Sequence, residues 1–97
     1  METVVERIHK LNNAGYTDNF IIQNGQLFSA ENGFVNTRHI KLDGTYRIES
    51  DSDPMHQTVI YALTCSEPSI KGLLINSYGP YSEQDKDEFI ESLIASQ

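Results

Sequence analysis

The sequence is poor in cysteine and in long apolar runs, and both absences exclude classes of protein. A lone Cys65 cannot form an internal disulfide, which argues against a disulfide-framed secreted mini-domain and favours a reducing compartment. The longest apolar runs, such as VIYAL (59–63), are far too short to span a bilayer. The opening METVVERIHK has no apolar stretch of the kind that signal peptides contain. These observations predict a cytoplasmic protein.

Basic residues are also scarce, with seven Lys and Arg against 14 Asp and Glu and a net charge of −7. Residues 1–48 carry five acids and five bases, whereas residues 49–97 carry nine acids and two bases. Phosphate backbones and anionic membranes bind clusters of Lys and Arg, and this chain has none, so we expect neither nucleic acid nor membrane as a partner. A basic protein or a cation fits the charge, although solubility alone would also explain it.

Motifs of known catalytic and cofactor sites are missing as well. The chain contains no GxGxxG, GxxxxGK[ST] or GxSxG sequence. His9, His39 and His56 have no ligand-type residue at helical spacing, so no zinc site is predicted. Cys65 ends an apolar strand pattern and is expected to be a buried thiol rather than a nucleophile. We therefore predict no metal, no cofactor and no catalytic residue.

What the sequence does contain predicts one domain, residues 1–97, with a helix at each end. Thr3 and Glu6 form a capping box that begins a helix over 3–14, and Gly15 is placed to end it. Ser82 is expected to cap the second helix. The apolar stripe of that helix comprises Phe89, Ile90, Leu93 and Ile94.

Between the helices the pattern predicts strands. Asn24-Gly25 indicates a hairpin with strands at about 19–23 and 26–30, and Asp43-Gly44 indicates a second turn of the same type. TVIYALTC (58–65) is apolar on both sides and predicts a central strand that is covered on both faces, at least in part.

Gly72, inside the last strand, indicates a bulge or a close backbone approach. Because short turns join antiparallel neighbours, the expected fold is α+β. It has an antiparallel, meander-like sheet of about five to six strands, with both helices packed on one face.

The stretch ESDSDP carries carboxylates at alternate positions. Glu49, Asp51 and Asp53 precede Pro54, and His56 follows. The spacing fails the calcium EF-hand pattern, which needs glycine at position 6 and glutamate at position 12. A looser oxygen cage or a pair of catalytic carboxylates stays open. A solvated loop between two strands, with Asp53 held extended by the proline, is the favoured interpretation.

The stretch NSYGPYS (76–82) places two tyrosines around a Gly-Pro turn at a strand-to-helix junction. Rigid tyrosines beside a turn can form a recognition surface with little loss of entropy on binding. Packing of a tyrosine against the sheet edge explains the same residues. The candidate binding residues of the sequence are Asp51, Asp53, His56, Tyr78 and Tyr81.

The stretches YRIESDSDP, VIYAL and KGLLINSYGPYS, in that order, resemble a family of small, uncharacterised bacterial proteins of about this length, over nearly the whole chain. Some members carry the label phosphoribosylpyrophosphate synthetase. In that enzyme a Thr/Gly-rich run follows the acidic residues of the ribose-phosphate loop, and DSDPMHQT lacks such a run. A chain of 97 residues also has no room for an ATP site and a second substrate domain. The resemblance therefore implies no activity and no catalytic residue.

From these patterns we expect a non-enzymatic binding or interaction domain, as monomer or homodimer. Its surface would combine the 49–56 loop with the 76–82 segment, and its partner would be a basic protein or a cation. One alternative is a small metal-dependent or carboxylate-using enzyme at the 49–56 loop. Another is a structural homodimer, because a sheet of this kind can present an edge strand for pairing.

Overall fold

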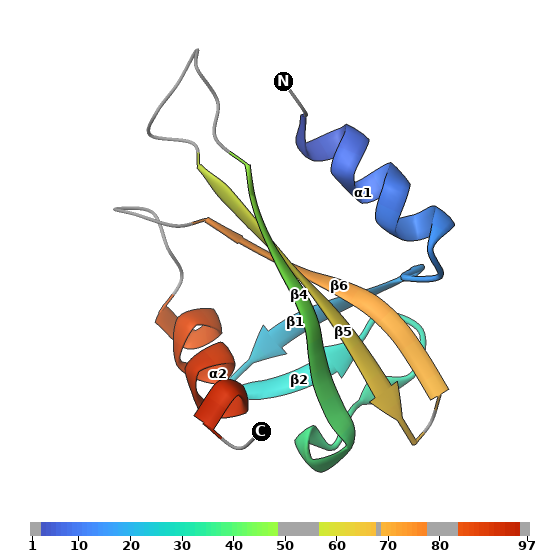
Figure 1. Cartoon of the computed structure of the whole chain (residues 1–97). Coiled ribbons are helices and arrows are strands. Elements are labelled where there is room, and N and C mark those ends of the chain that lie inside the picture. The colour runs from blue at the N-terminus through green and yellow to red at the C-terminus, as the bar shows by residue number, and fades with distance from the viewer. Residues whose placement is uncertain (1–2, 49–56, 68, 78–83, 96–97) are drawn as a thin grey trace.

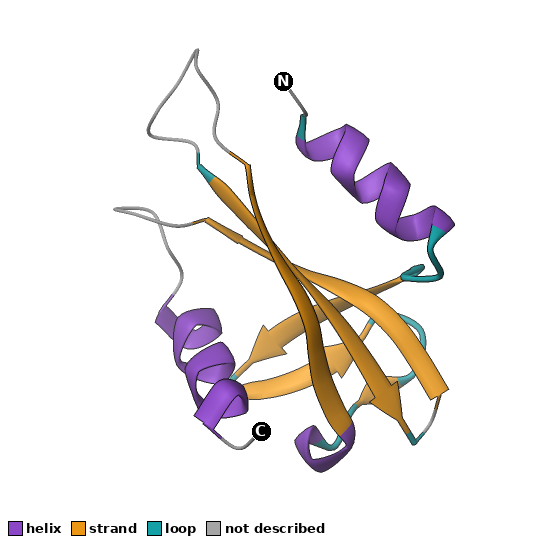
Figure 2. Cartoon of the chain, viewed as in Figure 1, coloured by secondary structure: helices purple, strands orange, loops and turns teal. Residues whose placement is uncertain are grey.

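The computed structural model describes residues 3–48, 57–67, 69–77 and 84–95 (Figures 1 and 2). It contains a helix near each end of the chain and six strands between them, so the predicted α+β class is confirmed. In chain order the elements are α1 (Val4–Asn13), β1 (Asp18–Gln23), β2 (Gln26–Ser29), β3 (Gly33–Phe34), the 3₁₀ helix η1 (Thr37–His39), β4 (Ile40–Ile48), β5 (Thr58–Ser66), β6 (Ser69–Ser77) and α2 (Gln84–Ala95).

The six strands form one sheet in the order β3-β2-β1-β6-β5-β4. Two antiparallel units, β1–β2–β3 and β4–β5–β6, meet where β1 runs parallel to β6. The predicted antiparallel meander is therefore right within each unit and wrong where the units join. Short turns determine which neighbours pair within a hairpin, but they carry no information about how two hairpin units meet.

The parallel junction depends on a close contact at Gly72, which pairs with Asp18. A Cβ added to Gly72 would lie 2.6 Å from the backbone oxygen of Asp18 and 2.9 Å from Cε2 of Phe20. Only glycine fits this approach without a shift of the backbone. The predicted close approach at Gly72 is confirmed.

Two hydrophobic cores lie on opposite faces of the sheet, and β5 contributes to both. Leu63 and Cys65 join the core that contains α2, whereas Ile60 and Ala62 join the core that contains α1. Alternate residues of a strand point to opposite faces, so the two helices cover different faces (Figure 1). The prediction that both helices pack on one face is wrong. The physical reason is that β5 is apolar on both sides, and each side needs a cover.

The local signals of the first hairpin and the first helix are confirmed. The Thr3 hydroxyl oxygen accepts a hydrogen bond from the Glu6 backbone N–H at 3.1 Å, which caps α1. Asn24 and Gly25 have φ angles of 53° and 75°, as a type I′ hairpin turn requires. Cys65 is fully buried, as expected. The expected cap at Ser82 lies outside the described residues.

The second predicted turn, at Asp43-Gly44, is wrong. β4 continues through both residues, and its pairing with β5 shifts register between Leu42 and Gly44. A β-bulge places an extra residue in one strand, and here that residue is Asp43. The Asp-Gly pair, which favours a turn, therefore lies at a β-bulge within a nine-residue strand.

No helix in the described part of the chain is long and apolar enough to cross a membrane.

Candidate functional site

The residues that the sequence singled out cannot be compared with the structure directly. Asp51, Asp53, His56, Tyr78 and Tyr81 all lie outside the described residues. The strand residues that flank these two segments are described. Ile48 pairs with Thr58, and Thr58 pairs with Ser77, so these three described residues lie at the same end of the sheet.

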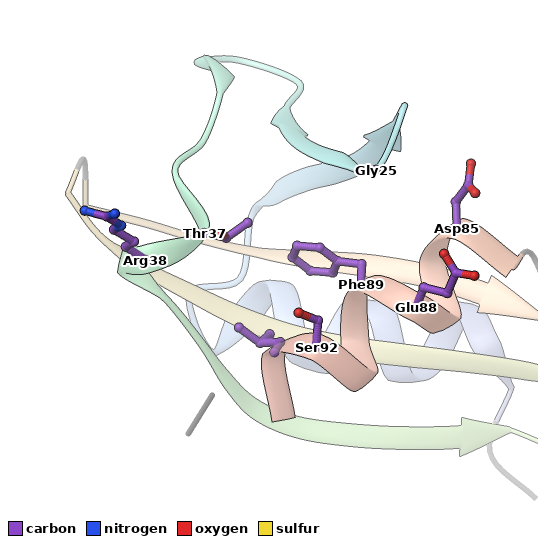
Figure 3. A pocket seen from close by; sticks show the side chains of 8 residues that line it. Gly25, Thr37, Arg38, Asp85, Glu88, Phe89 and Ser92 are labelled. Carbon is purple, nitrogen blue, oxygen red and sulfur yellow. The ribbon is translucent and has the colours of Figure 1, made fainter. Parts of the chain in front are cut away.

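A groove of about 400 Å³ lies beside α2 and is the candidate site (Figure 3). One wall is α2 itself, and the other is formed by the β1–β2 turn and by η1. The apolar surface of the groove comes from Phe89 and Leu93, which also belong to the core. The lining residues are Gly25, Thr37, Arg38, Asp85, Glu88, Phe89, Ser92 and Leu93.

Local structure holds both walls in place. The type I′ turn sets the position of Gly25, and the Asn36 side chain caps η1 by accepting a hydrogen bond from the Arg38 N–H at 3.0 Å. On the other side, Lys86 Nζ donates to the Ile75 carbonyl at 2.7 Å and Asn76 Nδ2 donates to Asp87 Oδ1 at 3.0 Å. These two bonds tie α2 to β6, so the groove lies between anchored elements.

Charge is distributed unevenly along the groove. Figure 3 shows Arg38 at one end, Asp85 and Glu88 at the other, and the Phe89 ring between them. Glu88 accepts a hydrogen bond from Gln84 at 2.9 Å, whereas neither Asp85 nor the Arg38 guanidinium forms an ion pair with another described residue. The groove therefore presents available charges of opposite sign at its two ends, separated by an apolar surface.

The acids of α2 also have a structural role. Asp85 and Asp87 lie in the first turn, where negative charge interacts favourably with the helix dipole. That role explains why the residues are acidic, but it does not require Asp85 to lie at a groove. The position of Asp85 beside Phe89 and opposite Arg38 follows from the packing of α2 on the sheet.

A second, more open groove of about 750 Å³ lies on the other side of α2, against β4 and β5. It repeats the combination of two carboxylates and one arginine. Burial raises the pKa of Tyr61 above its ordinary value of 10.0, and the negative charge of Asp87 raises the pKa further. The lining residues are Thr45, Arg47, Val59, Tyr61, Asp87, Ile90, Glu91 and Ile94.

On the opposite face of the sheet, the bulge residue Asp43 accepts two hydroxyl hydrogen bonds. The Tyr16 hydroxyl donates to Asp43 Oδ2 at 2.7 Å, and the Thr64 hydroxyl donates to the same oxygen. Lys71 Nζ lies 5.5 Å from the centroid of the Tyr16 ring. The hydrogen bond to the Asp43 carboxylate is the main cause that raises the pKa of Tyr16 above 10.0, and burial adds to it. This cluster fastens the segment between α1 and β1 onto β4 and β5.

Another polar cluster, formed by Asp18 and Ser29, is buried, and its hydrogen bonds are made within the fold. The Asp18 carboxylate accepts hydrogen bonds from the Ser29 hydroxyl and, at 2.7 Å, from the Asn19 N–H. Ser29 Oγ in turn accepts from the N–H groups of Glu31 and Asn32 at 3.2 and 3.1 Å. No buried side-chain nitrogen or oxygen of the described residues is left without a partner. The pair therefore organises the turn after β2.

The described residues contain no group of three or more His, Cys, Asp or Glu that could hold a metal ion. Within the candidate groove, Ser92 is a possible nucleophile by residue type, but its hydroxyl has no hydrogen bond to a base among the described residues. An activated serine needs such a base.

Sequence reasoning missed Arg38 and the groove that it ends. Phe89 and Leu93 belong to the apolar stripe that the sequence predicts for the second helix. No periodicity connects these residues with Thr37 and Arg38, because the two walls come from segments that are distant in the sequence. Only packing across the sheet brings them together.

Comparison of the chain with protein-family models, with curated proteins and with solved structures finds no match in any of the three. The resemblance to small bacterial proteins therefore stays a prediction.

Proposed function

We propose that the chain is a small, non-enzymatic binding domain that takes a basic, amphipathic segment of another protein in the groove beside α2. The observation that supports this most is the groove itself, whose floor is formed by the core residues Phe89 and Leu93 and whose one end carries the exposed carboxylates Asp85 and Glu88. An apolar side chain of the partner would bury against the surface, while a lysine or arginine would meet the carboxylates.

The charge of the whole chain favours the same class of partner. The entire net charge of −7 arises from residues 49–97, and α2 belongs to that half. An acidic field of this kind accelerates encounter with a basic partner and repels an acidic one. Arg38, at the far end of the groove, favours a segment that also carries a carboxylate there.

The proposed location is a reducing compartment such as the cytoplasm, because such a compartment suits the free, buried thiol of Cys65.

The test uses a fluorescently labelled peptide of leucine and lysine, compared with the same peptide in which glutamate replaces lysine. We expect the lysine peptide to bind and the glutamate peptide to bind at least about tenfold more weakly, since the carboxylates repel it. Fluorescence anisotropy gives the affinities, and amide chemical shifts show whether the residues that change line the groove.

The double variant Asp85→Asn/Glu88→Gln removes both carboxylates while it keeps the shape of the side chains. We expect it to weaken binding of the lysine peptide by about fivefold to tenfold, because each exposed charge contributes modestly. The matched control is Glu31→Gln/Glu91→Gln, which changes the net charge equally but lies outside the groove. Equal weakening by the control, or equal binding of the two peptides, would show that the groove is not the site.

A further inference from the structure

Three apolar side chains form a row across the outer strands of the sheet. Ile21 of β1 pairs with Phe28 of β2, and Phe28 pairs with Phe34 of β3. Residues that pair directly across strands lie on the same face. The rings of Phe28 and Phe34 meet edge to face, with centroids 5.9 Å apart and an interplanar angle of 72°. We call Ile21, Phe28 and Phe34 the apolar row.

Neither helix covers the apolar row. The strand residues in the core beneath α1 come from β4, β5 and β6, and the core beneath α2 lies on the other face of the sheet. Ile21 is 44% exposed and Phe34 is 59% exposed. Single exposed apolar residues are ordinary, whereas contiguous ones on neighbouring strands are typical of surfaces that contact another molecule.

The charge around the apolar row indicates what that molecule is. Residues 19–30 contain no Asp, Glu, Lys, Arg or His, and Glu31 is the only charged residue from 19 to 37. Copies of a chain with net charge −7 repel one another, so they can meet closely only where charge is absent. A basic partner, in contrast, would be drawn to the carboxylates of α2. The strands that carry the row lack charged side chains from residue 19 to residue 30, which favours a second copy of the same strands over a basic partner.

The other end of the sheet is less suited to self-association. The edge strand β4 carries Lys41, Asp43 and Arg47 together with a β-bulge. Charged side chains and bulges on an edge strand are features that prevent pairing with another copy. Contact through the face of the outer strands is therefore favoured over pairing through the β4 edge.

We propose that the apolar row is a self-association surface on which a second copy of this chain docks with two-fold symmetry. A two-fold interface brings the same patch of both copies together. With the axis at Phe28, Ile21 of one copy meets Phe34 of the other, and the two Phe28 rings lie side by side. The row has three side chains, whereas each partner of a standard interface contributes about 20–30 residues, so the dimer is weak and depends on concentration.

Sedimentation velocity of the full chain tests the proposal over concentrations from about 5 µM to about 500 µM, a range suited to a weak dimer. The mass should rise from 11.0 kDa toward twice that value. The variant Ile21→Thr/Phe34→Thr should weaken the dimer at least about tenfold, because it removes apolar area while threonine keeps a high β-propensity. A wild-type mass that stays at 11.0 kDa throughout would overturn the proposal.

The matched control is Val5→Thr/Ile94→Thr, which changes two apolar residues that are 76% and 56% exposed and lie outside the row. It should leave dimerisation unchanged, and a dimer that responds to this control but not to the row variant would overturn the proposal. If circular dichroism shows that the row variant does not fold, the experiment uses the single variant Phe34→Lys in its place. Phe34 lies on the two-residue strand β3.

Salt distinguishes this surface from one held by ion pairs. Added NaCl screens the repulsion between two acidic copies, so the dimer should become tighter or stay the same. A dimer that weakens with salt would contradict the proposal. The variant Asp85→Asn/Glu88→Gln should not weaken the dimer, which separates self-association from peptide binding in the groove.

Discussion

Strands β4, β5 and β6 have nine residues each, and they carry a helix-covered core on both faces. Strands β1, β2 and β3 have six, four and two residues, and within the described part of the chain they contribute to the core on the α2 face alone. The long unit therefore holds most of the apolar contacts of the fold. The short unit supplies one wall of the candidate groove on its covered face and exposes the apolar row on the other.

The difference indicates how a small domain can combine stability with binding. A sheet region that is covered on both faces opens rarely, because opening exposes two cores. A short unit covered on one face contributes less to stability and leaves surface available for partners. Both interaction surfaces proposed above involve the short unit, so experiments that compare the two units test this view directly.

The largest expected effect comes from a matched pair of core truncations. Leu74 in β6 and Leu27 in β2 are both fully buried in the same core. We expect Leu74→Ala to cost about 4 kcal/mol of the free energy of unfolding and Leu27→Ala about 2–3 kcal/mol, because a short hairpin can collapse into the cavity more easily. Urea unfolding measures both values. Equal costs would show that the two units are equally rigid.

Gly72→Ala tests the junction between the two units. The added Cβ would press against the backbone of Asp18, so β1 must move away from β6, and we expect a cost of about 2 kcal/mol. The comparison variant is Gly44→Ala in β4, where the added Cβ meets the Tyr46 side chain at 3.0 Å and can be relieved by its movement. Hydrogen exchange should show faster opening of β1 and β2 in Gly72→Ala. Exchange that accelerates equally in β5 would contradict a junction-specific effect.

The smallest effect is expected at the polar cluster on the α1 face. Tyr16→Phe removes the hydrogen bond to Asp43 and should cost about 1 kcal/mol at pH 7. The folded-state pKa of Tyr16 is raised above 10.0, so this contribution is fully present below pH 10 and is lost as the pH rises through the raised pKa. The stability difference between wild type and variant should therefore shrink above pH 10. A difference that stays constant with pH would mean that Tyr16 does not ionise next to Asp43.

Local signals in the sequence predicted local structure well. The Thr3–Glu6 cap, the Asn24-Gly25 hairpin and the two-sided apolar pattern of 58–65 all correspond to observed elements. Each depends on residues within a few positions of one another, where backbone conformation and hydrogen bonding act directly. The failure at Asp43-Gly44 shows the limit of such signals, since pairing with β5 extends the strand through a pair that favours a turn.

The candidate site was not predictable in the same way. The residues favoured from the sequence, Asp51 and Asp53 among them, lie outside the described residues and stay predictions. Arg38 carried no signal, because its role depends on the distance between η1 and α2. The apolar row was also hidden, since Ile21, Phe28 and Phe34 look like ordinary strand residues until the register places them side by side.

By itself, the sequence determined the α+β class, the helix at each end, the first hairpin and the acidic character of the second half of the chain. These properties arise from propensity, periodicity and charge, which act over short distances along the chain. The tertiary structure decided that β1 joins β6 in parallel, that the helices cover opposite faces, and that neither helix covers the face of the short unit that carries Ile21 and Phe34. Those outcomes depend on burying both sides of β5 at once, which is a property of the whole fold and of no single segment.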